Sequence, residues 1–121
     1  MTDLNIYANQ AYDDDGIPVA CLGIDSVPFS LHLWIYGDQI DLIPRVREAN
    51  WDDRQSLRIG RTAGTAAFWS ADAELVSILL GKDDESWDVA LRFPVDALDQ
   101  IYSQVSALKT WVTTTPRFPL K

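Results

Sequence analysis

The fold class of this chain is decided by residues 75–94, which read LVSILLGKDDESWDVALRFP. Residues 75–80 are apolar enough for either a buried helix or a buried strand. Residues 87–93 favour the strand, because apolar side chains alternate there with polar or small ones at the period of two residues typical of a strand. The polar residues 81–86 between them have the length of a hairpin loop. We therefore predict a β-hairpin over residues 74–93.

The same alternation predicts more strands upstream. In residues 29–36, Leu31 and Leu33 point to one face while His32 and Trp34 point to the other, which is the clearest strand pattern in the chain. The other predicted strands are residues 4–7, residues 17–24, and residues 56–61 and 65–70, which flank Ala63-Gly64 as a second hairpin. Residues typical of turns separate these segments, so we expect neighbouring strands to pair antiparallel.

Helical patterns are fewer. Near the end of the chain, one apolar stripe is formed by residues spaced three and four apart: Leu98, Ile101, Val105, Leu108 and Val112. Residues 43–54 have a weaker pattern, which predicts a short helix or a loop.

These elements belong to one domain, residues 1–121, because a chain of 121 residues has no room for a second one. Strands followed by a helix predict an α+β fold. We expect a twisted antiparallel β-sheet of about five to seven strands with the C-terminal amphipathic helix packed on one face.

The charge balance restricts the partners of the protein. There are 10 Lys and Arg residues against 18 Asp and Glu residues, which gives a net charge of −8. Such a field repels phosphate backbones and anionic membrane surfaces and attracts basic proteins. We therefore expect a basic protein partner, no nucleic acid and no membrane. Because residues 1–5 lack the basic region of a secretory signal and there is only one cysteine, we expect a cytoplasmic protein.

Few residues suit catalysis or metal binding. His32 and Cys21 are the only residues of their types, and on paired strands they would form a Cys–His dyad. The alternative, which composition favours, is a structural histidine and a buried thiol. Two such residues do not complete a zinc site, and residues 13–16, DDDG, lack the alternating ligands of a calcium loop. We therefore expect no metal, no other cofactor and no enzymatic activity.

Acidic residues in predicted turns are the first candidates for partner binding. They are Asp83, Asp84 and Glu85 in the hairpin loop, followed by Asp13, Asp14 and Asp15 in an earlier turn. Loops present carboxylates without desolvating them, and clustered carboxylates complement a basic surface. The alternative is that these charges only keep the protein soluble.

Trp34 and Trp51 are the second group of candidates. Aromatic side chains beside charges are typical of the residues that dominate binding energy at interfaces. The alternative is that both tryptophans belong to a second layer of the core. The five arginines within residues 45–61 either pair with nearby acids or face the partner.

Residues 75–94, together with the size, acidity and α+β pattern of the chain, resemble small bacterial immunity proteins of contact-dependent growth inhibition and related polymorphic toxin systems. The resemblance implies a cytoplasmic protein that binds a toxin domain, often a nuclease, and blocks its active site or substrate surface. Nuclease toxins are basic because they hold phosphate, so an acidic inhibitor suits them. Immunity proteins share no single fold or motif, so the resemblance transfers no site residue.

Two other functions stay open. A secretion-type chaperone, also small and acidic, would bind an unfolded segment along a sheet edge or apolar groove, usually as a dimer. A small enzyme would use His32 or Cys21. The sequence leaves the oligomeric state open.

Overall fold

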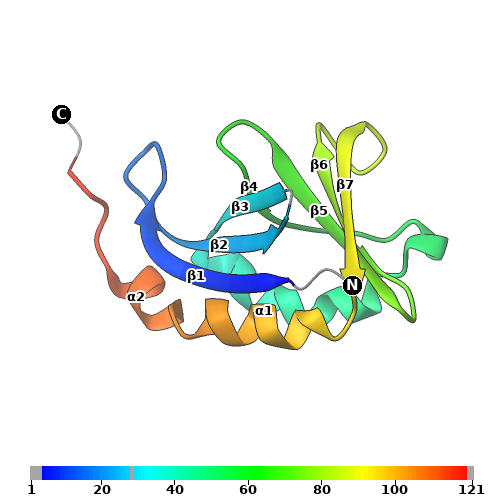
Figure 1. Cartoon of the computed structure of the whole chain (residues 1–121). Coiled ribbons are helices and arrows are strands. Elements are labelled where there is room, and N and C mark those ends of the chain that lie inside the picture. Colours follow the sequence, from blue (N-terminus) through cyan, green and yellow to red (C-terminus); the bar gives the residue numbers. More distant parts are fainter. Residues whose placement is uncertain (1–3, 28, 120–121) are drawn as a thin grey trace.

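The computed structural model of the chain describes residues 4–27 and 29–119, and Figure 1 shows its arrangement. Seven antiparallel strands form one sheet in the order of the sequence. The strands are β1 (Asn5–Tyr12), β2 (Pro18–Ser26), β3 (Phe29–Ile35), β4 (Leu57–Arg61), β5 (Ala66–Ala71), β6 (Leu75–Gly81) and β7 (Trp87–Pro94). The helices are η1 (Gly37–Glu48) and η2 (Trp51–Asp53), both 3₁₀, and α1 (Ala97–Ser106) and α2 (Lys109–Thr114). The predicted α+β class, antiparallel sheet and C-terminal helix are confirmed.

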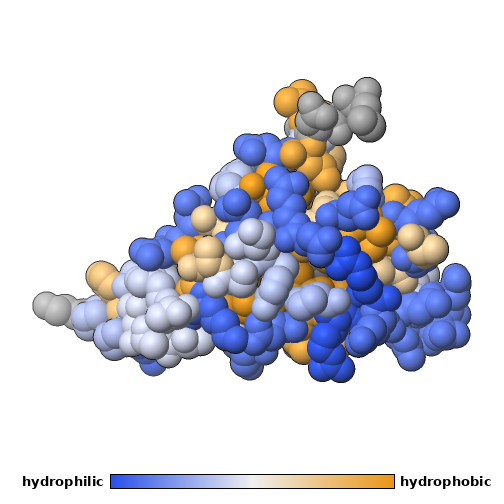
Figure 2. All heavy atoms as spheres, turned by 90° about the horizontal axis from the view of Figure 1, so that it is seen from below, coloured by the Kyte–Doolittle hydropathy of each residue, from blue (hydrophilic) through white to orange (hydrophobic). Residues whose placement is uncertain are grey.

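The core lies between the sheet and the helices η1 and α1, which run below the sheet in Figure 1. Leu98, Ile101 and Val105 of α1 are buried, as the stripe predicts, and α1 contacts η1, β1 and β2. Seen from below, the surface is mainly hydrophilic, with apolar atoms in scattered patches (Figure 2). The apolar side chains of the helices are therefore mostly turned inward.

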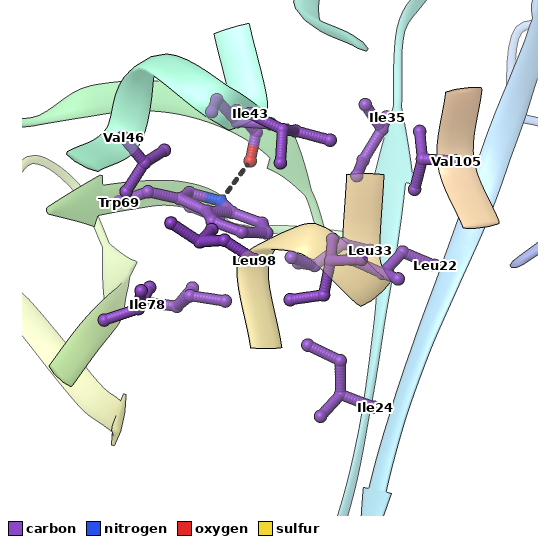
Figure 3. Packing of buried hydrophobic residues seen from close by; sticks show 14 of the residues in the cluster. Leu22, Ile24, Leu33, Ile35, Ile43, Val46, Trp69, Ile78, Leu98 and Val105 are labelled. Carbon is purple, nitrogen blue, oxygen red and sulfur yellow. Dashed lines mark hydrogen bonds between the residues drawn. The ribbon is translucent and has the colours of Figure 1, made fainter. Parts of the chain in front are cut away.

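The largest fully buried side chain is that of Trp69 in β5. Its indole Nε1 donates a hydrogen bond of 2.9 Å to the carbonyl oxygen of Ile59 (Figure 3). Trp69 thus fills the core without leaving a buried donor unpaired, which would be costly.

The joint between β3 and β4 is narrow, because among the described residues one pair, Trp34 and Arg61, connects the two strands. The side-chain oxygen of Gln39 in η1 extends it by accepting the backbone N–H groups of Gly60 (2.9 Å) and Tyr36 (3.2 Å). Gly60 has φ of +72°, and a Cβ there would lie 3.0 Å from the carbonyl oxygen of Trp34. Glycine suits both the backbone conformation and the close approach. This joint brings Arg61 next to the β1–β2 turn.

The helical segments differ from the sequence-based expectation. The first helix begins at Gly37, where the sequence indicates a turn, and covers twelve residues rather than starting near Ile43. Its buried side chains are Ile40, Ile43 and Val46, at spacings of three, which a 3₁₀ helix places on one side. The C-terminal helix is divided at residues 107–108 into α1 and α2. Local pattern alone did not reveal either feature.

The hairpin of β6 and β7 confirms the β-hairpin predicted for residues 74–93. The face to which Trp87 points differs from the prediction. Leu80 pairs with Val89 and Gly81 with Trp87, so Asp88 is an extra residue that forms a bulge. The bulge shifts Trp87 to the face of the sheet away from the helices, opposite to Val89. The regular alternation predicted from Trp87 onward is therefore wrong at Trp87. We call this face, which carries Tyr7, His32, Arg58, Ser77 and Arg92, the outer face.

Candidate binding surface

The first acidic turn, residues 13–16, is bound to its own chain. Asp13 is only 7% exposed. Its Oδ1 accepts the backbone N–H groups of Asp15 (2.8 Å) and Ile17 (2.9 Å), and its Oδ2 accepts the hydroxyl of Tyr36 at 2.6 Å. The expectation that turns leave their carboxylates solvated is wrong for Asp13, because three donors of the fold enclose it.

Arg61 completes the contacts of this turn. Its Nε donates to the hydroxyl of Tyr36 (3.0 Å) and a terminal nitrogen donates to Asp14 (2.9 Å), while the guanidinium lies 5.1 Å from the ring centre of Trp34. A terminal nitrogen also lies 3.8 Å from Asp13 Oδ2. Trp34 and the first acidic turn, which the sequence offers as separate binding features, therefore belong to one internal cluster.

The pKa of Asp13 reflects opposing effects. Burial raises it, but the hydrogen bonds from Tyr36, Ile17 and Asp15 and the charge of Arg61 lower it more, so the net pKa lies below its usual value. Carboxylate oxygens of Asp13, Asp14 and Asp15 lie within 4.8 Å of one another, a spacing that a cation can use. The positive charge already beside them is the guanidinium of Arg61.

The second acidic turn, residues 82–86, keeps most of its charge outside the fold. Asp83 Oδ1 accepts the backbone N–H groups of Glu85 (2.9 Å) and Ser86 (2.7 Å), which lower the pKa of Asp83. Asp84 Oδ2 accepts the hydroxyl of Ser56 at 2.7 Å. Within residues 4–27 and 29–119, none of Asp83, Asp84 and Glu85 has a Lys or Arg nitrogen within 4 Å. These three charges are available to a partner.

An open hollow of about 460 Å³ adjoins this turn. Asp84 lines it together with Arg45 and Glu48 from the end of η1 and Arg54 from the segment after η2. Arg45 and Glu48 pair at 3.8 Å. The lining therefore combines both signs of charge.

Trp51 contacts Arg54, one of the residues that line this hollow. Asn50 caps η2 by accepting the N–H of Asp52 (2.9 Å), and the guanidinium of Arg54 lies 5.0 Å from the ring centre of Trp51. Trp51 also lines a second, smaller hollow of about 20 Å³ with Trp87. The structure thus brings Trp51 and the acidic turn at Asp84 into one region, linked by Arg54.

Trp87 was not a candidate in the sequence, although it follows the acidic turn directly. It is 39% exposed on the outer face. The sequence pattern did not indicate this exposure, because regular alternation from Trp87 to Phe93 assigns Trp87 to the same face as Val89. Only the bulge at Asp88 separates the two, and an Asp in a strand is a weak signal for a bulge.

We name the region formed by Asp83, Asp84, Glu85, Trp51 and Trp87 the tryptophan surface. In Figure 1 the segment around η2 lies at one end of the molecule and the β1–β2 turn at the other. The sequence candidates therefore divide into two groups. Asp83 to Glu85 and Trp51 are exposed or half-exposed, and their carboxylates form no ion pair among the described residues, whereas Trp34, Asp13 and Asp14 contact Arg61. Asp15 is exposed.

His32 and Cys21 lie on neighbouring strands of the outer face, but each is engaged separately. His32 Nε2 lies 3.0 Å from the hydroxyl of Tyr7, which also donates to Asp25 at 3.2 Å. Cys21 pairs with Trp34 rather than with His32. Burial raises the pKa of the Cys21 thiol, which works against the thiolate that a nucleophile requires.

Comparison with protein-family models, with curated proteins and with solved structures finds no match for this chain. Among the described residues, no helix combines the length and apolar character needed to span a bilayer.

Proposed function

We propose that this protein binds a basic toxin domain, in the first place a nuclease, and neutralises it by covering its active-site surface with the tryptophan surface. The observation that carries the proposal is the second acidic turn. The carboxylates of Asp83, Asp84 and Glu85 form no ion pair among the described residues, and the turn leads directly into the partly exposed Trp87. Trp87 lines a small hollow together with Trp51.

The two kinds of side chain have different tasks in such a complex. A surface built to hold phosphate presents clustered Lys and Arg side chains, so the carboxylates attract it over long range and speed association. Tryptophans supply rigid apolar area at small entropic cost, which slows dissociation. The side chain of Asp83 closes an Asx turn that orders the loop before binding, so the loop loses little conformational entropy when the partner binds.

A kinetic experiment tests the proposal with the protein encoded by the adjacent gene as the partner. Neutralising the second turn with Asp83→Asn, Asp84→Asn and Glu85→Gln should slow association severalfold at low salt. The difference should shrink at high salt, since screening removes long-range attraction.

The matched control neutralises three exposed carboxylates outside the turn, with Asp38→Asn, Glu74→Gln and Asp96→Asn. Both triple variants carry the same net charge, so only position distinguishes them. Equal association rates for the two variants would contradict the role of the turn. A failure of the partner to bind the unaltered protein would overturn the proposal.

A secretion-type chaperone is the second candidate, and the free edge of β7 favours it. β7 is the last strand of the sheet, and Val89 and Trp87 on it are 47% and 39% exposed. An extended segment of another protein would add a strand there. A chaperone would bind an unfolded segment of its client, whereas an immunity protein binds the folded toxin domain, so binding to folded and urea-unfolded partner distinguishes the two.

A further inference from the structure

A row of polar residues crosses the outer face of β5, β6 and β7. Ser70 lies opposite Ser77, and Ser77 lies opposite Arg92. All three line the hollow of about 20 Å³, whose other walls include Trp51 and Trp87. A space of this size accommodates about one water-sized oxygen atom.

The hydroxyl of Ser70 lacks a partner in this hollow. Ser70 is only 1% exposed, and its Oγ forms no hydrogen bond with any of the described residues. A buried hydroxyl without a hydrogen bond is costly, and most buried polar groups of native proteins have partners. The Ser70 hydroxyl therefore indicates that an oxygen or nitrogen atom from outside residues 4–27 and 29–119 enters the hollow.

The lining favours an anionic oxygen. Arg92 brings a positive charge and up to five N–H donors, the serine hydroxyls add two more donors, and no carboxylate lines the hollow. Asp72 is an acidic residue near Arg92. The backbone N–H groups of Leu75 and Glu74 lower the pKa of Asp72, and the charge of Arg92 lowers it further. No Asp72 oxygen lies within 4 Å of the Arg92 guanidinium among the described residues, so that guanidinium keeps its donors free.

We propose that this hollow binds a carboxylate, with one oxygen beside the hydroxyls of Ser70 and Ser77 and the other on the guanidinium of Arg92. A carboxylate presents two oxygens, so one can accept from the serine hydroxyls while the other accepts a charge-assisted hydrogen bond from the guanidinium of Arg92. The indoles of Trp51 and Trp87 form further walls of the hollow and reduce the contact of the bound group with water, which strengthens its hydrogen bonds.

The inference rests on the proposed function in one respect, because it assigns the carboxylate to the toxin domain, as an Asp or Glu side chain or a chain terminus. The partner would then present a carboxylate next to its basic surface. The second acidic turn is negative and Arg92 is positive, so the two together present charges of both signs to the partner. This arrangement favours one orientation of the partner and disfavours partners whose surface is only basic.

The first test titrates the full chain with sodium acetate and follows the side-chain N–H signals by NMR at constant pH. Acetate should shift the indole N–H signals of Trp51 and Trp87 and the Nε–H signal of Arg92 saturably, in the millimolar range. Sodium chloride at the same ionic strength should not. The absence of a saturable shift would overturn the carboxylate site.

Single substitutions show whether acetate binds in the hollow itself. Ser70→Ala, which removes the unpartnered hydroxyl and therefore spares the fold, should weaken acetate binding severalfold, and Arg92→Gln should abolish it. Arg58→Gln is the matched control, because Arg58 is an exposed arginine on a strand of the same face but outside the hollow. Equal loss with Arg58→Gln would show a general charge effect and contradict the proposed site.

Binding of the protein encoded by the adjacent gene identifies the source of the carboxylate. If the carboxylate belongs to the partner, Arg92→Gln should weaken the complex at least tenfold and Arg58→Gln should leave it unchanged. Acetate should then compete with the partner for the hollow. Acetate binding without any effect of Arg92→Gln on the complex would assign the site to a free small carboxylate and overturn its part in the interface. If the partner does not bind at all, the proposed function fails, while the acetate titration still decides the hollow.

Discussion

The two acidic turns of this chain, residues 13–16 and 82–86, have similar composition and opposite structural roles. In the first, the carboxylate of Asp13 is enclosed by backbone N–H groups and the Tyr36 hydroxyl and lies near Arg61. In the second, Asp83 shapes its own loop and Glu85 is exposed. A run of acidic residues therefore shows only that carboxylates are present. Whether they stabilise the fold or meet a partner depends on the donors that the rest of the chain brings to them.

Tyr36 and Arg61 account for the difference. Tyr36 directly follows β3, and Arg61 is the last residue of β4. The joint at Gly60 and Gln39 places both side chains beside the first turn. From the described residues outside the loop, the carboxylates of the second turn accept one hydrogen bond, from the hydroxyl of Ser56 to Asp84. We expect substitutions at the first turn to change stability and substitutions at the second to change binding.

The largest expected effect is that of Asp13→Ala. It removes the acceptor of two backbone N–H groups and of the Tyr36 hydroxyl, and we expect a loss of about 3 kcal/mol in the free energy of unfolding. Urea unfolding measures it. Asp83→Ala, which also removes the acceptor of two backbone N–H groups, is the control and should cost far less because water replaces its exposed contacts. Equal losses would contradict the assigned difference between the turns.

Acid should reproduce part of this loss without a mutation. Because the pKa of Asp13 is lower in the folded protein, its ionised form contributes stability at pH values above the usual carboxyl pKa. That contribution is lost as the pH falls through the folded-state pKa. The difference in unfolding free energy between the protein and Asp13→Asn should be constant above about pH 5 and shrink toward pH 2. A constant difference over the whole range would exclude a role for the ionised carboxylate.

Tyr36→Phe should have a smaller effect, about 1–2 kcal/mol, since it removes one hydroxyl that donates to Asp13 and accepts from Arg61. Thermal or urea unfolding measures the change. Tyr102→Phe is a suitable control, because the Tyr102 hydroxyl also donates to an aspartate, Asp41, but at the surface. The first substitution should destabilise the protein more than the second.

Glu85→Gln should leave stability unchanged, because Glu85 is exposed and its carboxylate forms no ion pair with the part of the chain that the structure describes. Its effect should appear only as a slower association with the partner at low salt. A lowered unfolding midpoint for this variant would place the second turn, like the first, among the structural parts of the protein.

Several features could be predicted from the sequence because they depend on local periodicity. Alternation in residues 29–36 and 74–93 predicted strands that are present as β3, β6 and β7, and the stripe from Leu98 to Val105 predicted the buried side of α1. The candidate site was predicted in part, since Trp51 and residues 83–85 lie in one region of the structure. Whether they bind a partner stays a prediction.

The sequence by itself determined the class of fold, because side-chain period is a property of consecutive residues. Tertiary structure alone decided which acidic turn is neutralised, because Arg61 reaches Asp14 across 47 positions of the chain. It also decided the place of Trp87, since a bulge is defined by the pairing of two strands and not by either one. Local sequence fixes what a segment can form, whereas pairing between distant segments fixes which charges and tryptophans remain on the surface.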